Sequence, residues 1–194
     1  MKLQFGTWVR PMFGEPSGGD LAVVRDLGEA MLVAIVDVLG HGEEANVVAK
    51  GIAEFLGETE ETDLQTIIEI LHSRLKGGRG AAVGLALIVP DKEEMVYIGI
   101  GNTAARRVWR RATRLVSKDG TVGAHLRRSM PQVLQLDPGD TLLFYTDGVK
   151  DRFELSDYKH LISDTPASIA RNIVELFGKD YDDAACIAVK VDRQ

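Results

Sequence analysis

The chain has 194 residues, of which 45% are hydrophobic and 27% are charged, and its formal net charge is −6. This balance is typical of a globular protein with an ordinary apolar core, and we expect residues 1–194 to form one domain. The negative charge disfavours a nucleic acid as partner. The single cysteine, Cys186, excludes an intramolecular disulfide.

The sequence also disfavours export and membrane insertion. The N-terminal residues MKLQFGTWVR lack the apolar segment of a secretory signal peptide. The longest apolar run, Met31–Leu39, contains Asp37 and is too short to cross a bilayer. We therefore expect a cytoplasmic protein without a membrane partner.

Three strands are predicted at the start of the chain. Loose alternation of apolar residues predicts a strand at Leu3–Arg10, and the glycine-rich segment 14–19 predicts a turn after it. Asp20–Arg25 follows as a second strand. The apolar, β-branched run Met31–Val38 predicts a buried central strand.

Two helices are predicted next, because apolar residues recur at helical spacing in Glu43–Leu56 and in Asp63–Leu75. Gly57 is expected to end the first helix as its C-cap. Thr62 or Asp63 is expected to cap the second.

The second half of the chain returns to short strands separated by turn residues. The predicted strands are Ala82–Val89, Met95–Ile100, Ala104–Trp109, Thr113–Val116, Gln132–Leu136, Thr141–Thr146 and, at the end, Ala184–Val191. A late helix is predicted at Pro166–Phe177, with proline in its first turn. Strands joined by hairpins, with two helices inserted as a block, predict an α+β domain rather than βαβ winding.

The residues that suggest chemistry are aspartates. Asp20 follows two glycines, and Asp37 and Asp147 each end an apolar run. A charged carboxylate at the end of a buried strand is costly unless it is paired or bound to a metal. Together with Asp182 and Asp183, these side chains would form an oxygen-rich site for a hard divalent cation. Taken singly, each Asp-Gly pair is also what a simple turn requires.

The order of these segments resembles a known family. SGGD (17–20), DVLGHG (37–42), GDTLLFYTDGV (139–149) and DD (182–183) resemble the successive motifs of the metal-dependent type 2C serine/threonine protein phosphatases. The residues of these motifs are most similar to those of the bacterial SpoIIE-type branch, and the match extends from Ser17 to Val191. The resemblance implies a β-sandwich of two antiparallel sheets flanked by helices on both sides.

The resemblance also implies a site for two divalent cations, Mn²⁺ or Mg²⁺. The implied metal ligands are Asp20, Asp37, Val38 through its carbonyl oxygen, Asp147 and Asp182, with Asp183 as the alternative to Asp182. Asp37 would bridge the two ions, and Asp37 and Asp147 would be essential for catalysis. Water activated by the ions would attack phosphoserine or phosphothreonine without a phosphoenzyme. Cys186 lies within the apolar run Ala184–Val189, so we expect it to be a core residue.

His41 has two interpretations. It could donate a proton to the leaving serine oxygen, since a histidine suits that role near neutral pH. It could instead be a loop residue that caps the following helix, which we favour.

Several positions depart from the family pattern, and the pattern does not identify a phosphate-binding arginine. Ala185 stands where the family commonly has a small hydroxyl residue, and Gly19 stands where the eukaryotic branch has an acidic one, whereas Asp151 fits the SpoIIE-type pattern. Arg10 and Arg79 are the candidates for a phosphate-binding arginine by position. Surface salt bridges are the interpretation that we favour for both.

The main basic feature is the stretch Arg106–Arg114. We favour a solvated hairpin here. A docking surface for an acidic protein is the next interpretation, and RNA binding is the third.

About sixteen residues precede the first motif, which resembles the stand-alone catalytic domain of RsbX-type phosphatases. This implies phosphorylated STAS-domain and stressosome proteins as substrates, in negative feedback of bacterial stress signalling. Two other functions stay open: a non-catalytic phosphoprotein-binding module on the same scaffold, and a metal-dependent hydrolase of small phosphate esters. Loss of a ligand aspartate would mark the binding module, and all the expected aspartates are present.

Overall fold

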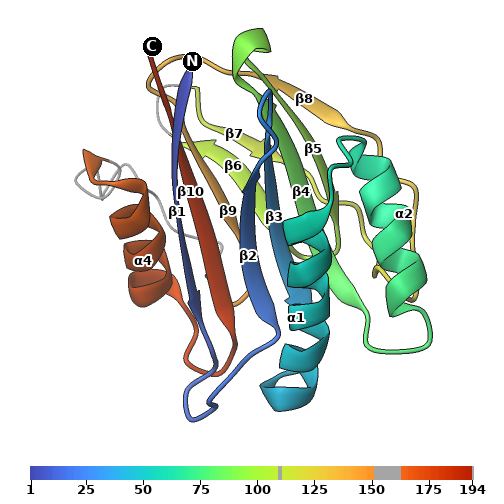
Figure 1. Ribbon diagram of the computed structural model, residues 1–194. Helices are drawn as coiled ribbons and strands as arrows, with labels where there is room; N and C mark the ends of the chain where they lie inside the picture. The colour runs from blue at the N-terminus through green and yellow to red at the C-terminus, as the bar shows by residue number, and fades with distance from the viewer. Residues whose placement is uncertain (109–110, 151–162, 194) are drawn as a thin grey trace.

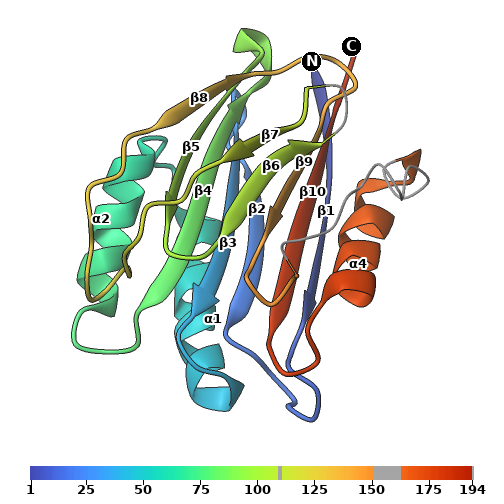
Figure 2. The same ribbon diagram turned by 180° about the vertical axis from the view of Figure 1, so that it is seen from behind.

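The computed structural model describes residues 1–108, 111–150 and 163–193. In these residues, ten strands form two antiparallel five-stranded sheets that pack face to face, with helices on both outer faces (Figures 1 and 2). The predicted α+β sandwich is confirmed.

The first sheet has the strand order β1-β10-β9-β6-β7. Its strands are β1 (Lys2–Arg10), β10 (Ala184–Asp192), β9 (Thr141–Tyr145), β6 (Ala104–Val108) and β7 (Thr113–Leu115). The second sheet has the order β2-β3-β4-β5-β8. Its strands are β2 (Asp20–Asp26), β3 (Met31–Val38), β4 (Ala81–Val89), β5 (Glu94–Ile100) and β8 (Gln132–Gln135), with the short 3-10 helix η1 (Pro90–Lys92) between β4 and β5.

The helices bury one face each. α1 (Gly42–Glu58) and α2 (Leu64–Leu75) cover the outer face of the second sheet, and α4 (Pro166–Phe177) covers the first sheet beside β1 and β10 (Figure 1). A third apolar layer lies between the sheets, where Ile35, Phe144 and Ile187 are fully buried. Burial of three apolar layers is the main stabilising contribution to this fold.

Two predicted helix ends can be compared with the structure. Asp63 caps α2, because its Oδ1 accepts a hydrogen bond from the Thr66 amide at 2.7 Å. The prediction for Gly57 was wrong, since α1 continues to Glu58 and its C-cap is Thr59. A glycine is not obliged to end a helix, and here the helical hydrogen bonding continues past it. Trp109, predicted as the last residue of a strand, lies outside the described residues.

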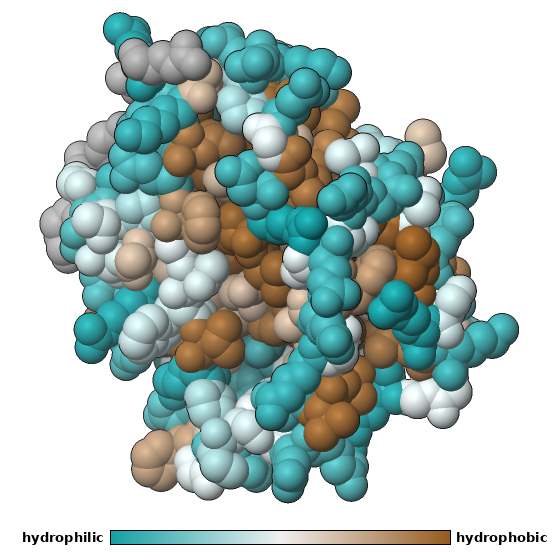
Figure 3. Space-filling model, viewed as in Figure 1, coloured by the Kyte–Doolittle hydropathy of each residue, from teal (hydrophilic) through white to brown (hydrophobic). Residues whose placement is uncertain are grey.

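β1 and β2 are end strands of the two sheets, and each is paired with a neighbouring strand on one side only. Phe5 and Val9 on β1 remain 50% and 42% exposed, and apolar side chains are visible at the surface in this region (Figure 3). In the part of the chain that the structure describes, no helix has the length and apolar character needed to span a membrane.

Candidate metal centre and adjoining cleft

The predicted aspartates gather at one end of the sandwich. β2 and β3 pair so that Asp20 lies directly opposite Asp37. In the other sheet, Tyr145 of β9 pairs with Cys186 of β10, which brings Asp147 and Asp182 together just beyond the strand ends. This end is the lower one in Figure 1, and both termini lie at the upper end. The residues meet because antiparallel pairing joins the end of one strand to the start of the next.

The carboxylates in this cluster have unusual protonation equilibria. Burial and the nearby Asp147 and Asp182 raise the pKa of Asp37 to about 6. Burial and the opposite Asp37 raise the pKa of Asp20 well above its ordinary value. The pKa of Asp182 is raised as well, mainly by partial burial and by Asp147. The cluster therefore favours the uptake of positive charge, whether as protons or as metal ions.

Asp20 is held by a hydroxyl that sequence reasoning missed. Thr146 is fully buried, and its hydroxyl donates to Oδ2 of Asp20 at 2.6 Å. The same hydroxyl oxygen accepts from the Ala185 amide at 2.9 Å. Ala185 itself offers no hydroxyl and packs between the sheets. At this place in the structure, the hydroxyl therefore comes from Thr146, the residue after β9, rather than from Ala185 in β10.

Asn102 is a second residue that was missed. Its Nδ2 donates to Oδ2 of Asp147 at 2.6 Å. Hydrogen bonding from the Asn102 side chain also lowers the pKa of Asp37, against the larger raising effects. The amide thus lies between two of the carboxylates. The sequence offered one signal, since residues 101–103 (GNT) lie between two predicted strands and include a glycine and an amide residue.

The two candidates for the last ligand differ in what surrounds them. Asp183 is only 4% exposed, and its two oxygens accept hydrogen bonds from the Met12 and Gly19 amides, both at 2.7 Å. A Cβ on Gly18 would overlap this carboxylate. The side chain of Asp182 is 42% exposed, with Lys179 Nζ at 4.0 Å from its Oδ2. Asp182 is therefore the more accessible of the two, and Asp183 holds the 12–19 loop.

The backbone near Val38 explains why position 19 has no acidic side chain. A Cβ on Gly19 would lie 2.8 Å from the Val38 carbonyl oxygen and 2.9 Å from Cβ of Ala45. No side chain fits there without a shift of β3 or α1. Val38 is the last residue of β3 and follows Asp37 directly.

His41 occupies the N-cap position of α1, but its side chain makes no capping hydrogen bond. The imidazole is 61% exposed, and its Nδ1 lies 3.4 Å from Oε1 of Glu15. The predicted position of His41 at the start of the helix is confirmed. The predicted capping role of its side chain was wrong.

The two candidate phosphate-binding arginines are both engaged elsewhere. Arg10 donates to the Lys179 carbonyl at 2.8 Å and lies 3.6 Å from Asp180. Arg79 donates to the Leu39 carbonyl at 2.9 Å and forms an ion pair with Glu44. The favoured interpretation, surface pairing, is confirmed for both.

The donor set fits hard divalent cations. Within the described residues, no three His, Cys, Asp or Glu side chains are already gathered tightly enough to form a metal-binding group. Mg²⁺ does not need such a group, because it keeps several waters and uses one or two carboxylates. The carboxylates of this cluster raise one another's pKa, and in the described part of the chain no lysine or arginine lies between the carboxylates of Asp20 and Asp37. Such ions prefer oxygen ligands of this kind.

Cys186 takes no part in this centre. It is fully buried in the layer between β10 and α4, and burial raises the pKa of its thiol. The prediction of a core cysteine is confirmed.

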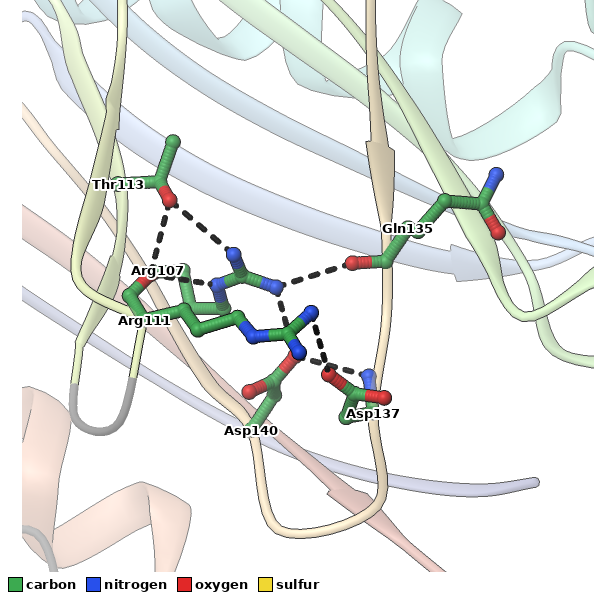
Figure 4. A network of polar contacts seen from close by, with 6 residues as sticks. All are labelled: Arg107, Arg111, Thr113, Gln135, Asp137 and Asp140. Atoms are coloured by element: carbon green, nitrogen blue, oxygen red, sulfur yellow. Dashed lines mark hydrogen bonds and ion pairs between the residues drawn. The ribbon is translucent and has the colours of Figure 1, made fainter.

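The basic stretch is only partly solvated. β6 and β7 form the predicted hairpin, yet Arg107 is only 6% exposed. Its guanidinium donates to the carbonyls of Arg111 and Gln135 and contacts Asp140 at 3.3 Å (Figure 4). A fully solvated hairpin was therefore the wrong interpretation for this residue, because its position on β6 faces the β8–β9 turn. Arg110, like Asp151, lies outside the described residues.

An open cleft of about 550 Å³ adjoins the carboxylate cluster. Asn102 and Asp147 line it on the side of the metal centre, and Lys150, Lys179 and Arg114 line it elsewhere. The cleft therefore places three basic residues next to the cluster of acids.

Comparisons with known proteins agree with this architecture. The sequence model of the stage II sporulation protein E (SpoIIE) family matches residues 28–192. The phosphoserine phosphatase RsbX of Bacillus subtilis is 26% identical over 89 residues, which make up 46% of this chain and 45% of that protein. The aligned part is thus about half of either protein.

Solved structures with low sequence identity share the fold. A chain from a structure of the bacterial stressosome, described as a modular system adapted to control secondary messenger signalling, has a TM-score of 0.89 and 24% identity, covering 98% of this chain and 100% of that chain. RsbX in complex with magnesium has a TM-score of 0.82 and 18% identity, with 98% and 96% covered. The S. agalactiae serine/threonine phosphatase has a TM-score of 0.80 and 15% identity, with 98% and 100% covered. The predicted resemblance to SpoIIE-type phosphatases and their fold is confirmed.

Proposed function

The chain belongs to the stage II sporulation protein E (SpoIIE) family, and we propose that it is a metal-dependent protein serine/threonine phosphatase whose single catalytic domain is residues 1–194. The observation that carries this proposal is the cluster of Asp20, Asp37, Asp147 and Asp182 at one end of the sandwich. The raised pKa of Asp37, about 6, reports unsatisfied negative charge there. A cluster of this kind requires cations at neutral pH.

We propose two divalent cations, Mn²⁺ or Mg²⁺, for this centre. Asp37 would be shared between them, and Asp147, Asp182 and the Val38 carbonyl would complete the first position. Asp20 would support the second position, oriented by Thr146. Asp183 would act on the loop through its two amide contacts instead of binding metal, which is supported by its burial and by the engagement of both its oxygens.

When bound, the cations supply the acidity that activates water and the charge that stabilises the phosphoryl oxygens. The residues of this chain orient and tune that centre. Thr146 fixes the Asp20 carboxylate, and Asn102 fixes one oxygen of Asp147. Fixed carboxylates need no reorganisation during the reaction, which is the usual source of electrostatic catalysis.

His41 is our proposed proton donor to the leaving oxygen. Its imidazole is exposed at the start of α1 and contacts Glu15. The test compares two leaving groups. A serine alkoxide needs a proton and a p-nitrophenolate does not, so His41→Ala should slow phosphoserine hydrolysis much more than p-nitrophenyl phosphate hydrolysis. Equal slowing of both substrates would leave His41 with a structural role only.

The proposed substrates are phosphorylated STAS-domain or stressosome proteins in the bacterial cytoplasm, with negative feedback as the role. The stressosome chain of similar fold and the RsbX relative support this proposal.

The decisive experiment measures dephosphorylation of a phosphoserine STAS-domain protein with Mn²⁺, with Mg²⁺ and with EDTA, for wild type and Asp147→Ala. We expect turnover that depends on the metal and is lost in the variant. Lys92→Ala, an exposed change on η1, is the control for handling and folding. Binding of the phosphoprotein without turnover under every metal condition would replace the enzyme with a phosphoprotein-binding module. Turnover of small phosphate esters alone would indicate a small-molecule phosphatase.

A further inference from the structure

We propose that the cleft beside Asp147 is a docking subsite for a second anionic group of the phosphoprotein, close in sequence to the phosphate that is removed. This inference rests on the proposed function and names a feature of its substrate. Two observations carry it: the position of the cleft relative to the carboxylate cluster, and the charge of the residues that line it.

Backbone pairing places two lysines at the cleft. Val149 forms an antiparallel bridge with Gly178, the Lys150 amide donates to the Phe177 carbonyl, and the Lys179 amide donates to the Gly148 carbonyl, both at 2.8 Å. This short pairing joins the segment after β9 to the segment after α4. Lys150 and Lys179, 29 positions apart in the sequence, therefore line one cleft.

The residues that line the cleft carry a net positive charge, whereas the net charge of the whole chain is negative. Lys150, Lys179 and Arg114 line it, and Asp147 is the one carboxylate among the described residues that do so. The complete chain carries a formal charge of −6. A local excess of positive charge on an acidic protein favours anionic partners and disfavours cationic ones.

Lys179 connects the cleft to the metal centre. Its Nζ lies 4.0 Å from Oδ2 of Asp182, and Asp147 belongs to both regions. A peptide whose phosphorylated residue reaches the carboxylate cluster would therefore place its neighbouring residues in the cleft. Arg10 and Arg79 cannot serve this purpose in their observed arrangement, because they are paired with Asp180 and Glu44.

We take the occupant to be an aspartate or glutamate side chain of the substrate, and the test distinguishes it from a second phosphorylated residue. Both offer negatively charged oxygens to an ammonium group. The cleft thus prefers substrate segments with acidic side chains beside the phosphorylated residue.

The test uses phosphothreonine peptides that are identical except for the flanking residues, which are glutamate, glutamine, lysine or phosphoserine. For the wild type, we expect kcat/KM to fall in the order glutamate, glutamine, lysine, with about tenfold between the extremes at low ionic strength and less at high salt. Lys150→Glu should lower the glutamate-to-lysine ratio by about tenfold. Lys92→Glu makes the same change in net charge on η1, where Lys92 is exposed, and should leave the ratio unchanged.

The outcomes separate this inference from the proposed function. Equal kcat/KM for all flanks, or the same shift of the ratio in both variants, overturns the docking subsite while the phosphatase stands. Absence of turnover with every peptide and with p-nitrophenyl phosphate overturns the phosphatase. In that case the Kd values of the same peptides for metal-free protein, measured by fluorescence anisotropy, still decide the subsite by the same ratio. A larger gain from phosphoserine than from glutamate identifies a second phosphate as the occupant, and otherwise the occupant is a carboxylate.

Discussion

Asp20 and Asp37 lie directly opposite each other across β2 and β3. Side chains at such a pair share one face, and their Cβ atoms are only about 5 Å apart. Two ionised carboxylates in this position repel each other, and burial increases the repulsion. The strand pairing at this end of the sandwich is therefore more stable when a proton or a cation reduces the charge.

The first prediction concerns the pH dependence of the metal-free protein. The pKa of Asp37 is raised from its ordinary value of 3.8 to about 6. Below about pH 4 the group is protonated in the folded and the unfolded state, so it has no effect on stability. Between about pH 4 and pH 6 the unfolded state ionises this carboxyl while the folded state keeps its proton, so stability falls by about 2–3 kcal/mol in total and the loss is complete above pH 6.

This loss is measured by urea unfolding in EDTA, comparing wild type with Asp37→Asn. The free energy of unfolding of the wild type should decrease relative to the variant between about pH 4 and pH 7.5. Mg²⁺ or Mn²⁺ should restore the wild type at the upper pH and should affect the variant much less. Parallel pH profiles for the two proteins would contradict the prediction.

The second prediction separates Asp182 from Asp183. Asp183→Asn turns one acceptor into a donor facing a backbone amide, which should destabilise the protein by about 2 kcal/mol. Asp182→Asn changes a half-exposed side chain, and should leave the melting temperature in EDTA almost unchanged. Its effect should be on metal affinity, lower by about tenfold because one ligand charge is lost. Calorimetric titration with Mn²⁺ and thermal melts check both halves, and the reverse pattern would make Asp183 the ligand.

The third prediction concerns Asn102. Its amide donates to Asp147 at 2.6 Å, so Asn102→Asp replaces a hydrogen bond by a repulsion between two carboxylates. We expect the metal-free variant to be less stable at about pH 7.5 by 1–3 kcal/mol. Added Mg²⁺ should raise its melting temperature more than that of the wild type. Asn102→Ala, which removes the donor without adding charge, should give a smaller increase with the metal.

The fourth prediction concerns Arg107, whose buried guanidinium contacts Asp140 at 3.3 Å. Arg107→Met leaves Asp140 buried without this partner and should lower the free energy of unfolding by about 3–5 kcal/mol. Arg111→Ala is the control, because the Arg111 side chain is 79% exposed and its carbonyl, the acceptor for Arg107, is kept. The control should change stability by less than about 0.5 kcal/mol. Metal affinity of folded Arg107→Met should match the wild type, since Asp140 and Asp147 lie at opposite ends of β9.

The local sequence pattern was sufficient to predict the helices and strands and the types of residue at the proposed metal centre. The run Met31–Val38 is β3 with identical bounds, and Pro166–Phe177 is α4 with identical bounds. Periods of two and of about 3.6 residues depend only on neighbours in the chain, so they can be read without knowing the fold. The order of the aspartate motifs similarly indicated the family before any contact was known.

The roles of individual residues depended on contacts between distant parts of the chain. Thr146 holds Asp20 across 126 positions, and Gly19 holds Asp183 across 164. Contacts between residues so far apart leave no pattern in the local sequence. This is why Thr146 and Asn102 were missed and why Asp182 and Asp183 could not be distinguished. Likewise, Arg107 belongs to a basic stretch that any local rule assigns to the solvent. Local pattern in the chain thus predicts which elements form and where carboxylates are available. Which carboxylates are desolvated, paired or open to a ligand depends on the folded molecule, because desolvation and hydrogen-bond geometry arise from packing between elements.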